Sequence, residues 1–272
     1  MIIKKIKLNN FTVFEDTVFD FNSGINILVG ENGTGKTHIM KLLYSACQSA
    51  NQKITFPQKI VNTMLPDDYK LSRLVTKKNG NHGASVSITA HSGKSDMNRI
   101  LTIEFSNKTK RFEAVMKGEE NWEKDFKDIS SIYIPAKEIL SNSYNLVAAV
   151  DKDNVRFDDT YIDVINSAKV DISKGRDSAE RKKRLSKIES IINGKVEYDA
   201  NRDEFYLKKG NTRQEFTLVA EGIRKMALLW QLVKNGTFID EWNENYPDFP
   251  VRRTNKPLKV YSLCPCRSLS SR

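Results

Sequence analysis

An eight-residue segment has the residue types and the spacing of a phosphate-binding loop. It matches G-x-x-x-x-G-K-[ST], and its members are Gly30, Glu31, Asn32, Gly33, Thr34, Gly35, Lys36 and Thr37. Glycines let backbone N–H groups turn inward around an anion, and a helix that follows directs its positive end at the phosphates. Lys36 is expected to reach the β- and γ-phosphates, and the Thr37 hydroxyl to hold Mg²⁺. The motif predicts a site for a nucleoside triphosphate and magnesium.

The flanking sequence supplies the strand and the helix that this loop requires. Residues 25–29 form an apolar run, which we interpret as a buried strand. Residues 36–50 repeat apolar side chains at helical spacing, namely Ile39, Leu42, Leu43 and Ala46. A strand before the motif and a helix after it argue against a chance glycine-rich turn.

Composition narrows the class of protein. At 272 residues the chain is long enough for one large domain or two lobes, and it has only three cysteines. Cys264 and Cys266 form a pair that lacks the further ligands of a zinc site. Apolar runs are too short to span a membrane. We therefore expect a soluble, cytoplasmic protein without a membrane partner.

The net charge of +10 is unevenly distributed. Residues 174–187 hold seven Lys and Arg against two acids. Such an excess suits a polyanion such as nucleic acid. A solvated helix face explains it equally well, because Leu185, Ile188 and Ile192 would form an apolar stripe behind the charges.

The spacing of apolar residues predicts strands and helices in an α/β arrangement. Period-two alternation predicts two N-terminal strands, an antiparallel meander and a hairpin, at residues 2–8, 17–21, 85–90, 99–105, 112–116, 195–198 and 204–207. Helical spacing dominates residues 141–193, and an apolar helix covers 223–233. Residues 51–83 are predicted to be an irregular polar insert that Pro57 and Pro66 break.

Together with the loop, three further segments resemble one group of ATPases. The group is the ABC-type ATPases related to RecF, Rad50, SMC and OLD-family proteins. The resemblance lies in the loop's form Gly-x-Asn-Gly-x-Gly-Lys-Thr and in residues 8–11, 132–138 and 220–225. They look like a bacterial branch of AAA-family ATP-binding proteins, and the match covers residues 1–236. The resemblance implies an α/β P-loop NTPase with a mixed central sheet, an antiparallel β subdomain and a helical lobe. It also implies ATP as the nucleotide and a role in DNA repair or phage defence.

We expect four regions along the chain. Residues 1–140 would form the P-loop and antiparallel β lobe, 141–194 the helical lobe, and 195–236 the hairpin, a signature-like segment and its helix. Residues 237–272 form an atypical tail, acidic up to residue 250 and basic after it. We take this change as a sign that the chain is truncated or frameshifted near Thr237.

The resemblance implies that two protomers meet head to tail around ATP. The signature-like residues supplied in trans would be Ala220, Glu221 and Gly222, where relatives often carry a serine in place of Ala220. A glycine at a helix start is a ready anion site, although an ordinary buried helix would explain the same residues. A homodimer would therefore form on ATP binding and act on DNA or on an effector protein.

Catalytic residues are not evident. Hydrolysis in this group needs an apolar strand that ends in Asp-Glu, and the best match, Asp240 with Glu241, follows only two apolar residues. Glu138 corresponds loosely to a position beside the γ-phosphate, but a capping or turn role fits it equally well. Whether the chain hydrolyses ATP is left open.

Two other functions fit parts of the sequence. The first is a non-enzymatic module that binds ATP or nucleic acid and acts only through a partner. The second is another P-loop enzyme, a GTPase or a small-molecule kinase. Residues 255–258 resemble a guanine motif but lack its acid.

Overall fold

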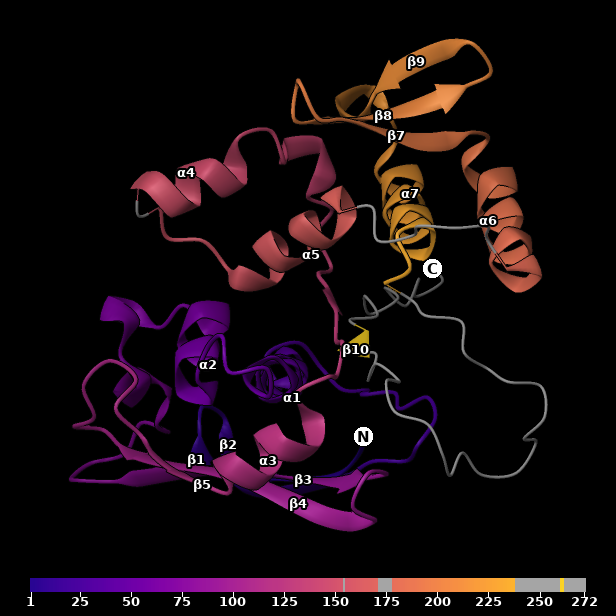
Figure 1. The fold of residues 1–272 in the computed structure, drawn as a ribbon. Coiled ribbons are helices and arrows are strands. Elements are labelled where there is room, and N and C mark those ends of the chain that lie inside the picture. The colour runs from indigo at the N-terminus through magenta and orange to yellow at the C-terminus, as the bar shows by residue number, and fades with distance from the viewer. Residues whose placement is uncertain (154, 171–177, 238–259, 262–272) are drawn as a thin grey trace, which may run out of the picture. The chain divides into compact units, whose positions relative to one another are not determined.

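The computed structural model describes residues 1–153, 155–170, 178–237 and 260–261. The chain divides into two compact units, one from Met1 to Tyr133 and another that begins at Ile134 (Figure 1). Within the described residues, no helix is both long and apolar enough to cross a bilayer. We describe each unit by itself.

The first unit is built on a five-stranded antiparallel sheet. Its order is β2-β1-β3-β4-β5, with the strands β1 (Ile2–Phe11), β2 (Phe14–Asp20), β3 (Gly83–Ser92), β4 (Met97–Ser106) and β5 (Val115–Lys117). Alternate residues of the central strands are buried, and the register pairs Ile6 with Ile88. One face of the sheet is therefore apolar and must be covered.

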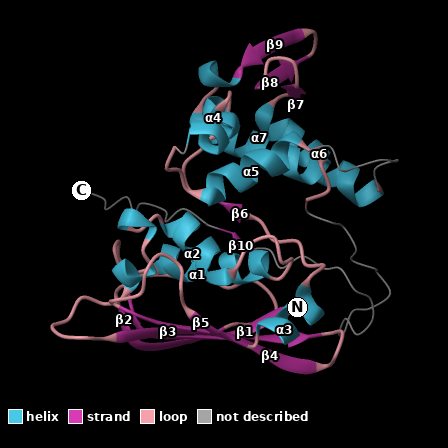
Figure 2. Ribbon diagram, turned by 60° about the vertical axis from the view of Figure 1, so that its left-hand side comes forward, coloured by secondary structure: helices cyan, strands magenta, loops and turns pink. Residues whose placement is uncertain are grey.

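Helices cover the apolar face of this sheet (Figure 2). They are α1 (Lys36–Ser49), α2 (Phe56–Met64) and α3 (Glu119–Phe126), with two short 3₁₀ turns, Asp67–Tyr69 and Leu71–Leu74. Leu42, Ile60 and Trp122, one from each helix, join the strand residues in a single core. The Trp122 indole also donates a hydrogen bond to the Ala46 carbonyl at 2.9 Å, which fixes α3 to α1.

The second unit combines helices with a small antiparallel sheet. Its elements are α4 (Leu146–Asp153), α5 (Asp159–Lys169), α6 (Ala179–Ile192), β7 (Lys195–Asp199), β8 (Glu204–Lys209), β9 (Thr212–Glu215) and α7 (Glu221–Lys234). At the β7–β8 turn Asp203 accepts hydrogen bonds from the Tyr198 hydroxyl at 2.7 Å and the Asn145 amide at 3.1 Å, and it pairs with Lys169. The strands β6 (Tyr133–Ile134) and β10 (Val260–Tyr261) form a separate two-stranded sheet.

The predicted α/β class, with an antiparallel β subdomain and a helical lobe, is confirmed. The strand predicted at residues 25–29 is wrong. This segment is not in a strand, and its side chains at Ile25, Ile27 and Val29 are 87%, 70% and 89% exposed. An apolar run becomes a buried strand only beside a strand that completes its ladder, and none of the described strands pairs with it.

The irregular insert predicted at residues 51–83 is also wrong. It contains α2, which begins after Thr55, whose hydroxyl accepts a hydrogen bond from the Gln58 amide. Pro57 lies in the first turn, where a missing N–H costs nothing. The four predicted region boundaries stay predictions, and most of residues 237–272 lie outside the described part.

Candidate nucleotide-binding site

The P-loop adopts a backbone that suits glycine at its key positions. Gly33 and Gly35 have φ angles of 84° and 88°. Gly35 is the N-cap of α1, and a β-carbon built there would lie 2.4 Å from Phe14 Cζ and 2.8 Å from Val13 Cγ2. Both the conformation and the contact with the β1–β2 turn therefore exclude a side chain at Gly35.

The Lys36 ammonium lies across the loop that precedes it. It donates a hydrogen bond to the Gly30 carbonyl at 2.7 Å and another to the Glu31 carbonyl. The Thr34 hydroxyl donates to the same Glu31 carbonyl at 2.9 Å. Lys36 thus places its charge against the loop backbone, within the segment that the motif assigns to the phosphates.

The start of α1 is open to an anion. Within the described residues no side chain caps it, and its first turn carries no acid. The first amides of a helix lack intrahelical partners, and they carry the positive end of the helix dipole. The loop and helix therefore fit a nucleotide phosphate. Thr37, exposed in that turn, is the residue that would hold the accompanying Mg²⁺.

A contact that the sequence did not predict ties the site to the first hairpin. His38 Nδ1 lies 3.0 Å from the Thr12 hydroxyl oxygen, and the Thr12 amide donates to the Leu74 carbonyl at 2.7 Å. Burial lowers the pKa of His38, and the charge of Lys41 lowers it further. Near neutral pH the first turn of α1 therefore carries a neutral imidazole beside the phosphate loop.

The signature-like residues lie at the exposed start of α7. Ala220 is the N-cap and makes no side-chain capping bond, and Glu221 and Gly222 are exposed. A β-carbon on Gly222 would meet no described atom within 4 Å. The described fold of this chain therefore does not itself require glycine at position 222.

Glu138 is held in a buried ion pair. Its carboxylate is 1% exposed and lies 2.9 Å from Arg224 Nε. It also accepts hydrogen bonds from the Ser141 amide at 3.2 Å and from the Ser141 hydroxyl at 2.8 Å. Arg224 Nη1 donates in turn to the Phe216 and Val219 carbonyls at 3.2 and 2.8 Å.

This ion pair joins the segments 132–138 and 220–225, both of which the resemblance singled out. The contacts of Glu138 are those of a structural group, and its catalytic role stays a prediction. Asp240 and Glu241 lie outside the described residues, as do Cys264 and Cys266. The described residues contain no cluster of three or more His, Cys, Asp and Glu side chains that could hold a metal ion.

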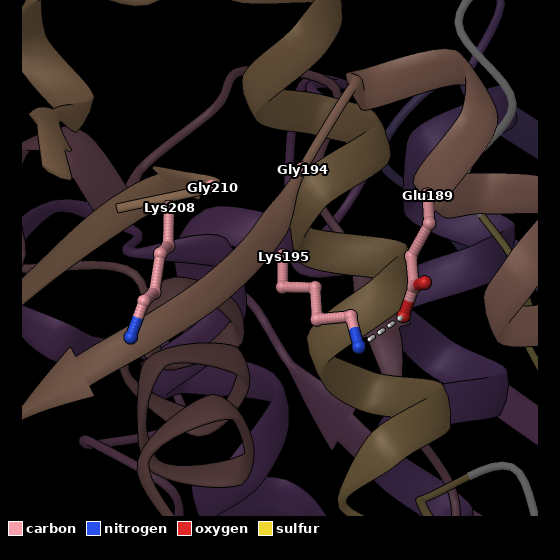
Figure 3. A pocket seen from close by; sticks show the side chains of 5 residues that line it. All are labelled: Glu189, Gly194, Lys195, Lys208 and Gly210. Carbon is pink, nitrogen blue, oxygen red and sulfur yellow. Dashed lines mark ion pairs between the residues drawn. The ribbon is translucent and has the colours of Figure 1, made fainter. Parts of the chain in front are cut away.

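A cavity of about 350 Å³ opens in the second unit between α6 and the β7–β8 hairpin (Figure 3). It is lined by Glu189, Gly194, Lys195, Lys208 and Gly210. Lys195 Nζ lies 3.9 Å from a Glu189 oxygen, and Lys208 Nζ lies 3.8 Å from Glu197. Each lysine that lines the cavity therefore has a carboxylate nearby, and the charges largely offset one another.

Comparison with known proteins assigns the family. The family model described as "AAA domain" matches residues 5–226, which include the P-loop and the start of α7. The chain belongs to the AAA domain family. It is thus a relative of P-loop ATPases, as the resemblance implied.

Among curated relatives, the AAA-domain chain is similar to DNA replication and repair protein RecF of Francisella tularensis subsp. mediasiatica and of subsp. novicida. Each is 29% identical over 118 residues, which cover 39% of this chain and 34% of the relative. The match thus spans about a third of the length of these relatives.

Similar solved structures include RecF with ATP, which is 12% identical. The match covers 95% of this chain and 83% of that chain, with a TM-score of 0.44. Another is the Smc head domain bound to the C-terminal domain of ScpA, from Pyrococcus furiosus. It is 10% identical, the match covers 88% of this chain and 79% of that chain, and the TM-score is 0.45.

Proposed function

We propose that this AAA-domain chain binds Mg²⁺-ATP at its P-loop and that binding joins two copies head to tail. The observation that supports ATP binding is the geometry of the P-loop. Gly35 is fixed against Phe14, Lys36 lies across the loop, and the start of α1 has no side-chain cap among the described residues. Backbone amides and a lysine arranged in this way bind phosphate oxygens.

The start of α7 supports the proposal that two copies join head to tail. Gly222 is exposed, and no described neighbour explains a glycine there. A close approach from a second copy would explain it, because the uncapped amides of α7 could then face the phosphates held by the partner's P-loop. The N-cap Ala220 brings no hydroxyl to this contact, so we expect the second copy to bind the phosphates only modestly.

The RecF relatives, which are named as DNA replication and repair proteins, support a role on DNA of the repair type. A role in phage defence and a cytoplasmic location are further parts of the proposal and rest on the resemblance in sequence. ATP would hold the two copies as a clamp, and its hydrolysis would release them. Glu138, Asp240 and Glu241 are the residues that we propose as candidates for hydrolysis. An effector protein would be a second partner.

The buried Glu138–Arg224 pair favours the alternative function. A carboxylate held in this way is not free to orient a water. Hydrolysis would then depend on Asp240 and Glu241, and without their action the chain would bind ATP without turning it over. It would then act as a non-enzymatic module through its partner. Clamping by ATP is common to both functions.

Mixing two defective variants tests the head-to-tail clamp. Lys36→Ala removes the P-loop ammonium, and Gly222→Asp places a carboxylate where the trans phosphate would lie. Each variant alone should stay monomeric in sedimentation velocity with Mg²⁺-ATP, whereas the wild type dimerises. An equimolar mixture should form heterodimers, because one of its two composite sites keeps both wild-type parts. A mixture that stays monomeric while the wild type dimerises would refute the head-to-tail arrangement, and a wild type that stays monomeric would refute the clamp.

A further inference from the structure

The outward face of α6 carries a row of cations without described partners. Lys182, Lys183 and Lys187 are exposed, whereas Leu185 and Ile192 on the other side of the helix are buried. Within the described residues, no carboxylate lies within ion-pair distance of these three lysines. We call Lys182, Lys183 and Lys187 the α6 lysine row.

The position of this row is unfavourable for the helix itself. α6 has cations at four consecutive positions, residues 181–184, in its first two turns, and only Glu180 as an acid in the first turn. The positive end of the helix dipole repels cations in the first turn, which here are Arg181 and Lys182, and this effect falls off beyond that turn. Lys183 and Lys187 also form a like-charge pair four residues apart. Of the four consecutive cations, Arg184 is offset by an ion pair with Glu180.

An external polyanion would remove both penalties. We propose that the α6 lysine row binds the phosphate backbone of nucleic acid, an inference that rests on the proposed role on DNA and assigns it a surface. A duplex carries about one negative charge per 1.7 Å of its axis, so one face of a helix meets several phosphates. Ser186 and Ser190 lie on the same exposed face, but their hydroxyls donate to the Lys183 and Lys187 carbonyls at 3.0 and 2.7 Å, so the lysines carry the proposed contact.

The composition of the face argues for nucleic acid rather than a lipid surface. An interfacial helix needs a broad face of large apolar side chains beside its cations. On α6 the one large apolar residue that is markedly exposed is Ile191, at 54%. Backbone contacts by lysine carry no sequence information, so we expect binding that is insensitive to sequence.

The test is a fluorescence-anisotropy titration of a labelled 30-base-pair duplex with the full chain, at several KCl concentrations. The triple variant Lys182→Gln, Lys183→Gln, Lys187→Gln should bind at least tenfold more weakly than the wild type. The slope of log affinity against log salt should fall by up to about 2.7, at roughly 0.9 for each phosphate that the variant no longer neutralises. The matched control is Lys53→Gln, Lys77→Gln, Lys108→Gln, three exposed lysines of the first unit, which removes the same charge and should stay within twofold.

Equal affinity of the two triple variants would overturn the proposal, and so would a wild type that binds no duplex. A loss of binding to phosphatidylserine vesicles with unchanged duplex binding would overturn it in favour of a membrane partner. ATP binding and ATP-dependent dimerisation are measured on the same samples. If dimerisation fails while the α6 variant still loses duplex affinity, the clamp is refuted and this surface assignment stands.

Discussion

Phe14 lies against Gly35, so that a β-carbon built at position 35 would be 2.4 Å from the Phe14 ring. This contact seats the start of the P-loop helix on the turn between β1 and β2. The Thr12–His38 contact at 3.0 Å makes a second link between the same two elements. The phosphate loop is therefore positioned by the first hairpin as well as by its own glycines.

Alanine at Gly35 should cost more than alanine at Gly33. Both residues have left-handed backbone, which costs a non-glycine residue about 1–2 kcal/mol. Only at Gly35 does a β-carbon also collide with Phe14 and Val13, whereas at Gly33 no described atom lies within 4 Å. Urea unfolding should therefore show Gly35→Ala to be less stable than Gly33→Ala by at least about 1 kcal/mol. Equal stabilities would contradict the contact.

Serine at Ala220 should strengthen α7. Ala220 is the N-cap and has the extended backbone, φ −57° and ψ 139°, in which a serine hydroxyl accepts a hydrogen bond from an amide of the first turn. Ala220→Ser should raise the free energy of unfolding by about 1 kcal/mol. If this hydroxyl also reaches a phosphate in trans, the ATP-dependent dimer should tighten severalfold in sedimentation equilibrium. If Ala220→Ser is more stable but its dimer is no tighter, the serine caps α7 and does not reach a phosphate in trans.

Removing the charge of Glu138 should destabilise the fold. Glu138→Gln leaves Arg224 without its carboxylate, although Arg224 keeps its carbonyl partners. We expect a loss of about 2 kcal/mol in urea unfolding, below the 3–5 kcal/mol typical of a fully buried pair. The double variant Glu138→Gln, Arg224→Gln should lose less than the sum of the two single losses. A Glu138→Gln variant that keeps full stability but loses ATP turnover would instead assign Glu138 to catalysis.

Acid should remove the contribution of Asp125. Burial alone raises the pKa of this carboxyl, but hydrogen bonds from Arg99 and Ser95, both at 2.6 Å, outweigh burial and hold the pKa below its ordinary value. A lowered folded pKa gives stability that is complete above the unfolded value of about 3.9 and is lost as pH falls through the folded pKa. Asp125→Asn should be less stable by about 1–2 kcal/mol at pH 7, and the difference should shrink below pH 4. A difference that is constant down to pH 2 would contradict this origin.

Much of the first sheet and of the hairpin β7–β8 could be predicted, because each strand buries alternate side chains and the pattern is visible in the sequence. The helix predicted at 223–233 is α7 (Glu221–Lys234). The sequence pattern does not reveal α2, because Pro57 usually marks a break, whereas in a first turn proline is compatible with a helix. The strand predicted at residues 25–29 failed for another reason. Its apolar pattern is clear, but a strand also needs a neighbour, which the pattern does not show.

The phosphate loop could be predicted because its chemistry depends on residue types at fixed spacing. The contacts that position this loop could not be predicted from the sequence. Thr12 and His38 are 26 residues apart, and nothing in their local sequence links them. The Glu138–Arg224 pair likewise joins residues that only the fold brings together. The sequence predicted separate roles for the two segments, a position beside the γ-phosphate for Glu138 and a contact in trans for residues 220–222. The structure links the segments through one ion pair.

The central claim is that this P-loop binds ATP, and paired calorimetry and turnover assays test it directly. The wild type should bind Mg²⁺-ATP, and Lys36→Ala should lose at least about 2 kcal/mol of binding free energy, because a charged partner of the phosphates is removed. Binding by the wild type without turnover would support the non-enzymatic module, and turnover that Lys36→Ala abolishes would support an ATPase. Equal ATP affinity for the wild type and Lys36→Ala, or no binding by either, would contradict the account.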